Sequence, residues 1–346
     1  MISKSKDKLV LACIVDNFIN TGMPIGSSNL IKKYNLIWSP STVRSVFHDL
    51  MKRGYLRQEH ISSGRIPTEK GIRSRIVDII STMETNNENK ENILKIFDNV
   101  YGTLDQIVNN VSNLLSDITH TGCFATLPSK GNMKIQTFQI VELRKNECLI
   151  IIVFEGGITE KVFTRLDHEI PTHSINQISN FLNELALGLT LGELKDKMIK
   201  KVKAPLSKYS TMIEALIKFS MDAFDKENTV DIMMHGKLTQ FNNDTLDNIE
   251  ISKNLLHVFE EREFLTDFME IVLKGNKTKV FIGNYNGMPN GISMIAAPYG
   301  SGVKQGSLGI FGPIRMNYSK IIPLVTYSAD YLTNVIDFGG TNVTWE

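Results

Sequence analysis

The segment from Ser39 to Arg75, SPSTVRSVFHDLMKRGYLRQEHISSGRIPTEKGIRSR, most constrains what this chain can fold into. Ser39 is a favourable helix cap, and Pro40 suits the first position of a helix. Apolar residues then recur at helical spacing and predict one buried face, formed by Val43, Phe47, Leu50 and Met51. The opposite face is polar: Ser41, Thr42, Arg44, Ser45 and His48. Such a face fits the major groove of DNA, although a water-exposed helix surface gives the same pattern.

The residues around this helix favour the DNA interpretation. A first helix with Leu9, Cys13, Ile14 and Phe18 on one face should end at Gly22, and a short second helix should follow before the turn at 35–38. After Gly54, the extended stretch 55–58 returns through 62–64 to 65–68, which predicts a hairpin. The order is therefore helix, helix, turn, helix, hairpin. An ordinary hairpin with surface charge would look the same in isolation.

Charge is concentrated in this part of the chain. Residues 1–80 contain thirteen Lys and Arg against six Asp and Glu, a net charge of +7, whereas the remaining residues carry −6. A basic segment on a nearly neutral protein is typical of phosphate contacts. We expect the short polar residues and Arg44 to approach base edges. The cations of the hairpin and of the stretch after it should serve mainly phosphates or the adjacent minor groove: Arg65, Lys70, Arg73 and Arg75. His60 and Ser63 of the hairpin are further DNA-binding candidates.

The remaining length suggests one or two further domains. The polar stretch 81–92 is either a linker or a frayed helix end, and a long amphipathic helix is expected from Ile93 to Ile118, either as a dimer contact or as a core helix. Strands are expected at 135–143, 149–154 and 159–166, then a mostly helical block at 174–273 with weak strand candidates at 232–235 and 238–241. Short strands return at 280–283, 293–297 and 307–311, before a final helix at 318–336.

No set of residues points to catalysis. The glycines between Gly300 and Gly312 lack the Gly-Lys-Ser/Thr ending of a phosphate loop and fit hairpin turns better. His168 and His173 are not at ligand spacing, and three widely spaced cysteines argue against a disulfide framework or a zinc site. We therefore expect no enzyme activity, cofactor or metal. Because no secretory signal or membrane-spanning run is found, a cytoplasmic protein with no membrane contact is expected.

The chain resembles the HrcA family of heat-inducible transcription repressors over nearly its whole length. The resemblance is carried by NFINTGMPIGSSNL, SPSTVRSVFHDLMKRGYL and HISSGRIPTEKGIR, and in the C-terminal part by 280–283, 306–313 and 315–318. There are departures from the family pattern. Members usually have Ala-Thr-Ile-Arg-Asn where this chain has Ser41 to Ser45, and they tend to have Lys at Ser28, Tyr at Ile72 and Thr at Ile314. These differences bear on operator preference.

The resemblance implies an α+β multidomain fold. An N-terminal winged helix-turn-helix (1–80) and a linker (81–92) would precede a GAF-like α/β domain in two parts (93–170 and 275–346), interrupted by a mainly helical inserted dimerisation domain (171–274). It also implies a homodimer that represses chaperone operons by binding an inverted repeat, the CIRCE element, in double-stranded DNA. Heat would relieve the repression, and the GroE chaperonin would maintain the DNA-binding form.

Dimerisation has a physical motive, because a single winged helix engages one half-site and makes few phosphate contacts. The candidate interface is a dense apolar helix in the inserted block, although the same residues could form an intrachain core: Ile213, Leu216, Ile217, Phe219 and Phe224. Two other functions stay open at this point. One is a winged-helix regulator whose GAF-like domain senses a metabolite, and the other is an RNA-binding or scaffold protein.

Overall fold

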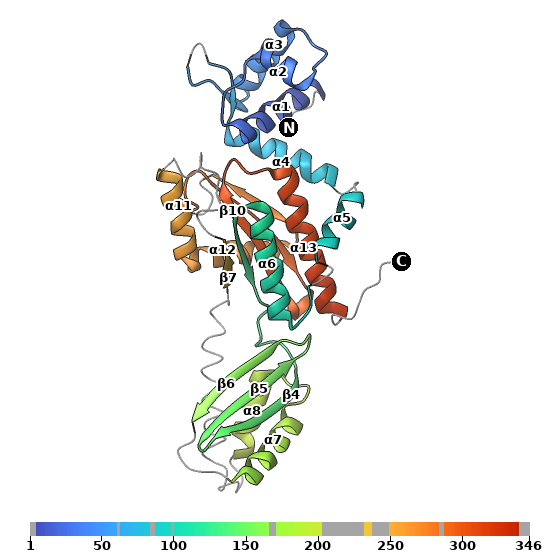
Figure 1. Cartoon of the computed structure of the whole chain (residues 1–346), viewed down its shortest axis with the longest axis vertical. Coiled ribbons are helices and arrows are strands. Elements are labelled where there is room, and N and C mark those ends of the chain that lie inside the picture. The colour runs from blue at the N-terminus through green and yellow to red at the C-terminus, as the bar shows by residue number, and fades with distance from the viewer. Residues whose placement is uncertain are drawn as a thin grey trace.

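The computed structural model describes residues 5–60, 63–83, 87–97, 100–165, 171–202, 232–236, 249–283 and 287–338, which form a mixed α+β fold. Its elements fall into three groups along the long axis of the molecule (Figure 1). The first group, called the N-terminal unit below, comprises residues 5–83. It contains helices α1 (Ser5–Thr21), α2 (Ser27–Tyr34), α3 (Pro40–Lys52) and α4 (Glu69–Met83), with strands β1 (Leu56–Arg57) and β2 (Ile66–Pro67).

Local signals explain where the elements of the N-terminal unit begin and end. Helix α2 ends at Asn35, whose φ of 50° places it in the left-handed region, and Asn is one of the few residues that tolerate this conformation. The Ser39 side chain accepts a hydrogen bond from the backbone N–H of Thr42 at 3.3 Å and caps α3. Gly54, with φ of 74°, turns the chain from α3 into β1. The expected order of helix, helix, turn, helix and hairpin is confirmed.

The second group, called the body below, is built on a five-stranded antiparallel sheet in the order β7-β3-β10-β9-β8. The strands are β3 (Gly122–Thr126), β7 (Ile232–His235), β8 (Lys279–Ile282), β9 (Ile292–Tyr299) and β10 (Gly306–Pro313). Four helices cover the two faces: α6 (Leu104–Thr119), α11 (Ile249–Glu260), α12 (Arg262–Gly275) and α13 (Tyr318–Phe338). Leu308 and Ile310 join the apolar core of α6 and α13, whereas Phe311 joins that of α11 and α12. This alternation along β10 is what a sheet buried on both faces requires.

Helix α13 confirms the final helix expected from the sequence and packs on β9, β10, α6 and α5 (Asn87–Leu94). Among the described ranges, no helix is both long and apolar enough to cross a lipid bilayer.

The third group, called the three-stranded unit below, lies at the far end of the molecule from the N-terminal unit (Figure 1). It comprises β4 (Ile135–Arg144), β5 (Glu147–Phe154) and β6 (Thr159–Arg165), with α7 (Thr172–Ala186) and α8 (Leu191–Val202) behind the sheet. The three strands confirm the sequence expectation and pair in the order β4-β5-β6. Two side chains of α7 reach the β4 backbone: Asn183 Oδ1 accepts from Phe138 N at 2.7 Å, and Ser179 Oγ accepts from Ile140 N at 2.9 Å.

The grouping of strands differs from the expected division at residues 170 and 274. Strands β4 to β6, expected in the first part of the GAF-like domain, form a sheet of their own. Helices α11 and α12, expected in the inserted block, pack on the five-stranded sheet, where Phe259 contacts Phe311 with ring centroids 4.8 Å apart. Strand periodicity reveals a strand but not its partner, because sheet membership depends on contacts between distant segments.

Two further expectations differ from the structure. The long helix expected from Ile93 to Ile118 is divided. The backbone at Gly102 (φ 136°) is not helical, and Thr103 with Gln106 forms a capping box that starts α6. The polar stretch 81–92, expected as a linker or a frayed helix end, does contain the end of α4, at Met83, but it also contains most of α5. The candidate dimer residues Ile213, Leu216, Ile217, Phe219 and Phe224, and the weak strand candidate at 238–241, lie outside the described residues.

The central strand β10 should dominate the stability of the body. Ile310→Ala removes a fully buried side chain and should lower the free energy of unfolding by about 2–5 kcal/mol, measured by urea denaturation. Ile37→Ala is the matched control, because Ile37 is 90% exposed in the turn before α3 and its loss should change stability by less than about 0.5 kcal/mol. Equal effects of the two substitutions would contradict this packing.

Candidate nucleic-acid interface

Helix α3 carries the polar residues expected at a DNA groove on its exposed face. Ser41, Arg44, Ser45 and His48 are exposed, and Thr42 is half-buried. The opposite face holds Val43, Phe47 and Leu50 in the core, with at most 5% of each exposed, and Met51 half-buried beside them. The helix is therefore fixed by its apolar side and presents short polar groups and one arginine to the outside.

Three hydroxyl groups meet at the N-terminal end of α3. Ser39 Oγ lies 2.8 Å from Ser41 Oγ and 2.9 Å from Thr42 Oγ1, in addition to capping the helix. Farther along, Arg44 Nε donates to Ser27 Oγ at 3.4 Å and so reaches the first turn of α2. The sequence did not predict Ser27 as the partner of Arg44, because a contact spanning seventeen residues leaves no local signal. These contacts order the polar end of α3 before any ligand is bound.

The hairpin beside α3 is a two-stranded ribbon extended by a third segment. Leu56 pairs with Pro67 and Arg57 with Ile66. Beyond the ribbon, Ile25 and Arg65 exchange backbone hydrogen bonds of 3.2 and 2.9 Å, so the loop before α2 runs along β2. This pairing fixes the ribbon to the helices that precede it.

The conspicuous hairpin residues serve its internal structure. Ser63 Oγ accepts from the backbone N–H of His60 at 3.0 Å and donates to the His60 carbonyl at 2.7 Å. The Arg65 guanidinium donates to the carbonyls of Ser63 (3.1 Å) and Gly64 (3.3 Å), and its Nε lies 2.8 Å from Met51 Sδ. His60 is exposed, whereas Arg65 is half-buried against the ribbon and α3. The structure thus places Arg65 where it holds the ribbon to α3.

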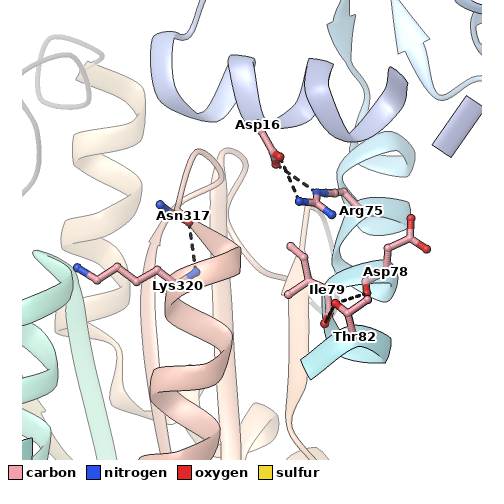
Figure 2. Close-up of polar contacts among 7 residues, drawn as sticks. All are labelled: Asp16, Arg75, Asp78, Ile79, Thr82, Asn317 and Lys320. Atoms are coloured by element: carbon pink, nitrogen blue, oxygen red, sulfur yellow. Dashed lines mark hydrogen bonds and ion pairs between the residues drawn. The ribbon is translucent and has the colours of Figure 1, made fainter. Parts of the chain in front are cut away.

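The cations after the hairpin have partners within the chain. Lys70 Nζ donates to the Arg53 carbonyl at 2.8 Å and lies 4.7 Å from the centroid of the Tyr55 ring. Arg75 makes two hydrogen bonds to the Asp16 carboxylate, at 3.1 and 3.2 Å, which join α4 to α1 (Figure 2). Arg73 donates to the backbone carbonyl of Ile282 in the body. Arg73 and Arg75 therefore face the rest of the protein, apart from the polar face of α3.

Buried charge supports the base of the N-terminal unit. Asp7 is only 4% exposed and pairs with Arg53 at 3.5 Å, which joins α1 to the end of α3. Burial, with a smaller contribution from Asp16, raises the pKa of the nearby Cys13 thiol to about 11. The thiol is therefore protonated at neutral pH and acts as an apolar core group.

Gly64 should be essential for the attachment of the ribbon. A Cβ at this position would lie 2.4 Å from the carbonyl carbon of Ile25, against backbone that is itself hydrogen-bonded. Gly64→Ala should destabilise the protein by about 2–3 kcal/mol and remove hydrogen-exchange protection from the Ile25 and Arg65 amides. Gly26→Ala is the control: its Cβ meets open space, so the cost should stay under about 1 kcal/mol. Persistent protection of both amides in Gly64→Ala would contradict the close approach.

Comparisons with known proteins agree over almost the full chain. The family model described as HrcA protein C terminal domain matches residues 105–322, more than half of the chain. The heat-inducible transcription repressor HrcA of Syntrophobacter fumaroxidans is 26% identical over 97% of this chain and 98% of that protein. The repressor of the same name from Clostridium botulinum strain Alaska E43 is 29% identical over 95% of this chain and 96% of that protein.

A solved structure supports the fold. A crystal structure described as that of a hypothetical protein aligns with 97% of this chain and 99% of its own, with a TM-score of 0.68 and 21% identity. The overall arrangement of elements is therefore shared with an experimentally determined protein. The family match and the similar relatives show that the chain belongs to the HrcA family of heat-inducible transcription repressors, which are DNA-binding regulators of the heat-shock response and not a class of enzyme.

Proposed function

We propose that this protein represses chaperone operons by binding a CIRCE-type inverted repeat as a homodimer, through an N-terminal winged helix-turn-helix. The observation that carries the proposal is the exposed polar face of α3, supported from behind by an apolar core and flanked by a two-stranded ribbon. Helix α3 is the recognition helix, and the ribbon is the wing. The net charge of +7 on residues 1–80 supplies the attraction to phosphates.

Roles among the candidate DNA residues follow from where each side chain lies. Arg44, Ser41, Ser45 and His48 are exposed on α3 and are proposed to approach base edges, with Thr42 at the edge of that face. At the wing, His60 is exposed, while Ser63 and Arg65 shape the turn that follows it. Lys70 borders the wing and is proposed to contact a phosphate after releasing the Arg53 carbonyl. Arg73 and Arg75 are proposed to act on DNA binding only through the contacts they make within the chain.

The body is proposed to be the GAF-like domain, and the three-stranded unit to belong to the inserted dimerising domain. The insertion would then lie between β3 and β7, which are neighbours in the sheet but are separated by more than a hundred residues in the sequence. The face of the three-stranded sheet opposite the buried residues of β5 supplies an apolar surface for a second copy. Leu149 pairs with Val141 on one side and with Phe163 on the other, and Phe163 is 74% exposed.

The alternative of a metabolite-sensing domain gains no specific support. Such a domain needs a concave pocket with converging polar groups. On the α13 side of the sheet the described residues form a buried, mainly apolar core, and the Tyr318 hydroxyl there is satisfied by Ser293 Oγ at 3.0 Å and the Ile314 carbonyl at 2.8 Å. We propose instead that the body senses heat through its own marginal stability, and that GroE chaperonin restores the DNA-binding form.

Fluorescence anisotropy tests the proposed function directly. The protein is titrated onto a duplex carrying the CIRCE-type repeat and onto a scrambled duplex, at two salt concentrations, with and without GroE chaperonin. A preference for the repeat of about a thousandfold or more is expected, with loss of binding near the melting temperature of the free protein. Equal and steeply salt-dependent binding to both duplexes, even with the chaperonin, would reject operator recognition.

Arg44 should discriminate between these duplexes. Arg44→Ala is expected to cost about 1–3 kcal/mol on the repeat and much less on scrambled DNA, because a bidentate contact to a base is lost. Lys52→Ala is the control, since Lys52 is an exposed cation in the last turn of the same helix and its loss should weaken both duplexes equally. Equal losses on the two duplexes for Arg44→Ala would assign this residue to the DNA backbone.

A further inference from the structure

The N-terminal unit is seated on the body through α4. This helix packs on α1 within the unit and on α13 and β8 of the body. Its apolar residues Ile72, Ile76 and Ile79 are buried in one continuous core that also contains residues of α1 and α13. Figure 1 shows α4 lying across the end of α13, between the first three helices and the sheet. We call the packing of the N-terminal unit on α13 and β8 of the body the seam. Movement of the unit relative to the body requires these contacts to separate.

One charged contact crosses the seam at the end of β8. Arg73 of α4 donates to the backbone carbonyl of Ile282, and a charge-assisted hydrogen bond is roughly twice as strong as a neutral one. Next to it, the Glu69 carboxylate occupies the space beside Gly283, within 2.1–2.4 Å of where a Cβ would lie. Gly283 has φ of 70°, so both the space and the backbone conformation favour glycine at this point. The first turns of α4 are thus fitted closely to one loop of the body.

A second charged contact crosses the seam from the opposite direction. Arg315 lies in the body between β10 and α13, and its guanidinium carbon is 5.8 Å from the centroid of the Phe18 ring in α1. Its guanidinium also fills the space beside Gly22, where a Cβ would lie 2.4–2.8 Å away. Helix α1 ends at Thr21, and a cation beyond a helix C-terminus interacts favourably with the helix dipole. Arg315 Nε is buried without a hydrogen-bond partner, so this side chain is held by packing and charge.

Further contacts hold the helices of the N-terminal unit to each other and to the body. The Arg75 and Asp16 pair joins α4 to α1 within the N-terminal unit, and Figure 2 shows it above the Asn317 end of α13 and to one side of it. Toward the other end of α4, the Tyr327 hydroxyl donates to the Met83 carbonyl at 3.5 Å. In the next helix, α5, Lys90 pairs with Asp330 of α13 at 3.4 Å. Arg73 connects α4 to the body, and Arg315 of the body contacts the end of α1.

We infer that Arg73 and Arg315 are positioning residues for operator recognition, which fix the orientation of the N-terminal unit on the body and thereby set the half-site separation that a dimer accepts. This inference rests on the proposed function, in which a dimer binds an inverted repeat. Neither side chain needs to touch DNA in this role. One base pair changes the separation of half-sites by about 3.4 Å and about 35° around the duplex axis. A rigidly seated unit cannot follow that change, whereas a loosely seated one can.

Binding to repeats of altered spacing tests the inference. Arg73→Ala, Arg315→Ala and the double variant are titrated onto the native repeat, onto repeats lengthened or shortened by one and two base pairs, and onto a single half-site. Lys320→Ala is the matched control, because it removes an exposed cation from the first turn of α13. For the native protein and Lys320→Ala, one base pair should cost about tenfold or more in affinity.

In the double variant, that penalty should fall to about threefold or less, while half-site affinity stays within about twofold of the native protein. Arg73→Lys should keep more of the spacing penalty than Arg73→Ala does, because lysine can still donate to the Ile282 carbonyl. If an alanine variant fails to fold, the lysine variant is tested in its place. An unchanged spacing penalty in folded variants would overturn the inference. So would an equal loss of affinity for the half-site and for every repeat, because that result would mean a direct DNA contact.

A measurement without DNA separates this inference from the proposed function. Spin labels are attached at Lys52→Cys on α3 and Lys253→Cys on α11, both exposed positions, and labelled chains are diluted with unlabelled protein so that only distances within one chain are measured. The native protein and Lys320→Ala should give one narrow distance distribution, and the double variant a broad one. A broad distribution in the native protein, or no broadening in the double variant, would overturn the inference. If the native protein shows no preference for the repeat, the proposed function fails, and these distances still decide whether the two arginines fix the unit.

Discussion

The burial of one apolar face of α4 between the N-terminal unit and the body is the constraint on which the rest of this structure depends. An amphipathic helix normally has one apolar face toward its own core. Here Ile72, Ile76 and Ile79 belong to a core shared by the N-terminal unit and the body. The polar face of α3 therefore has a defined direction relative to the five-stranded sheet. In the homodimer that we propose, which would read two half-sites, this direction would matter as much as the chemistry of the face itself.

The same seam explains why arginines near α4 differ in role from those on α3. Arg44 is exposed on α3, and its Nε donates to Ser27 Oγ at 3.4 Å. Arg73 and Arg75 instead donate hydrogen bonds to Ile282 and Asp16, and Arg65 donates to carbonyls of the ribbon. A positive charge near a DNA-binding element thus has two distinct uses, one in attracting phosphate and one in holding the element in place.

Much of the N-terminal unit could be predicted from local sequence. The cap at Ser39, the apolar spacing from Val43 to Leu50 and the break at Gly54 are each recognised within a few residues, and the structure has the corresponding helix and turn. The strands at 135–165 and the helix from Tyr318 were predictable for the same reason. Sheet membership was not predictable, because β3 pairs with β7 although the whole three-stranded unit lies between them in the sequence. The division near Gly102 was also missed, since apolar spacing continues through it while the backbone does not.

The sequence by itself determined the type of each local element, the concentration of positive charge before residue 80, and the motifs that carry the resemblance to the HrcA family. It determined these because helix caps, periodic burial and net charge depend on residues close together in the chain. Only the tertiary structure decided that Arg65 holds the ribbon to α3, that Arg75 meets Asp16, and that Arg315 of the body lies beside Phe18 of the N-terminal unit. The packing of segments that are distant in the sequence determines which group a long arginine side chain contacts. Neither the position of the arginine in the sequence nor its charge identifies that partner.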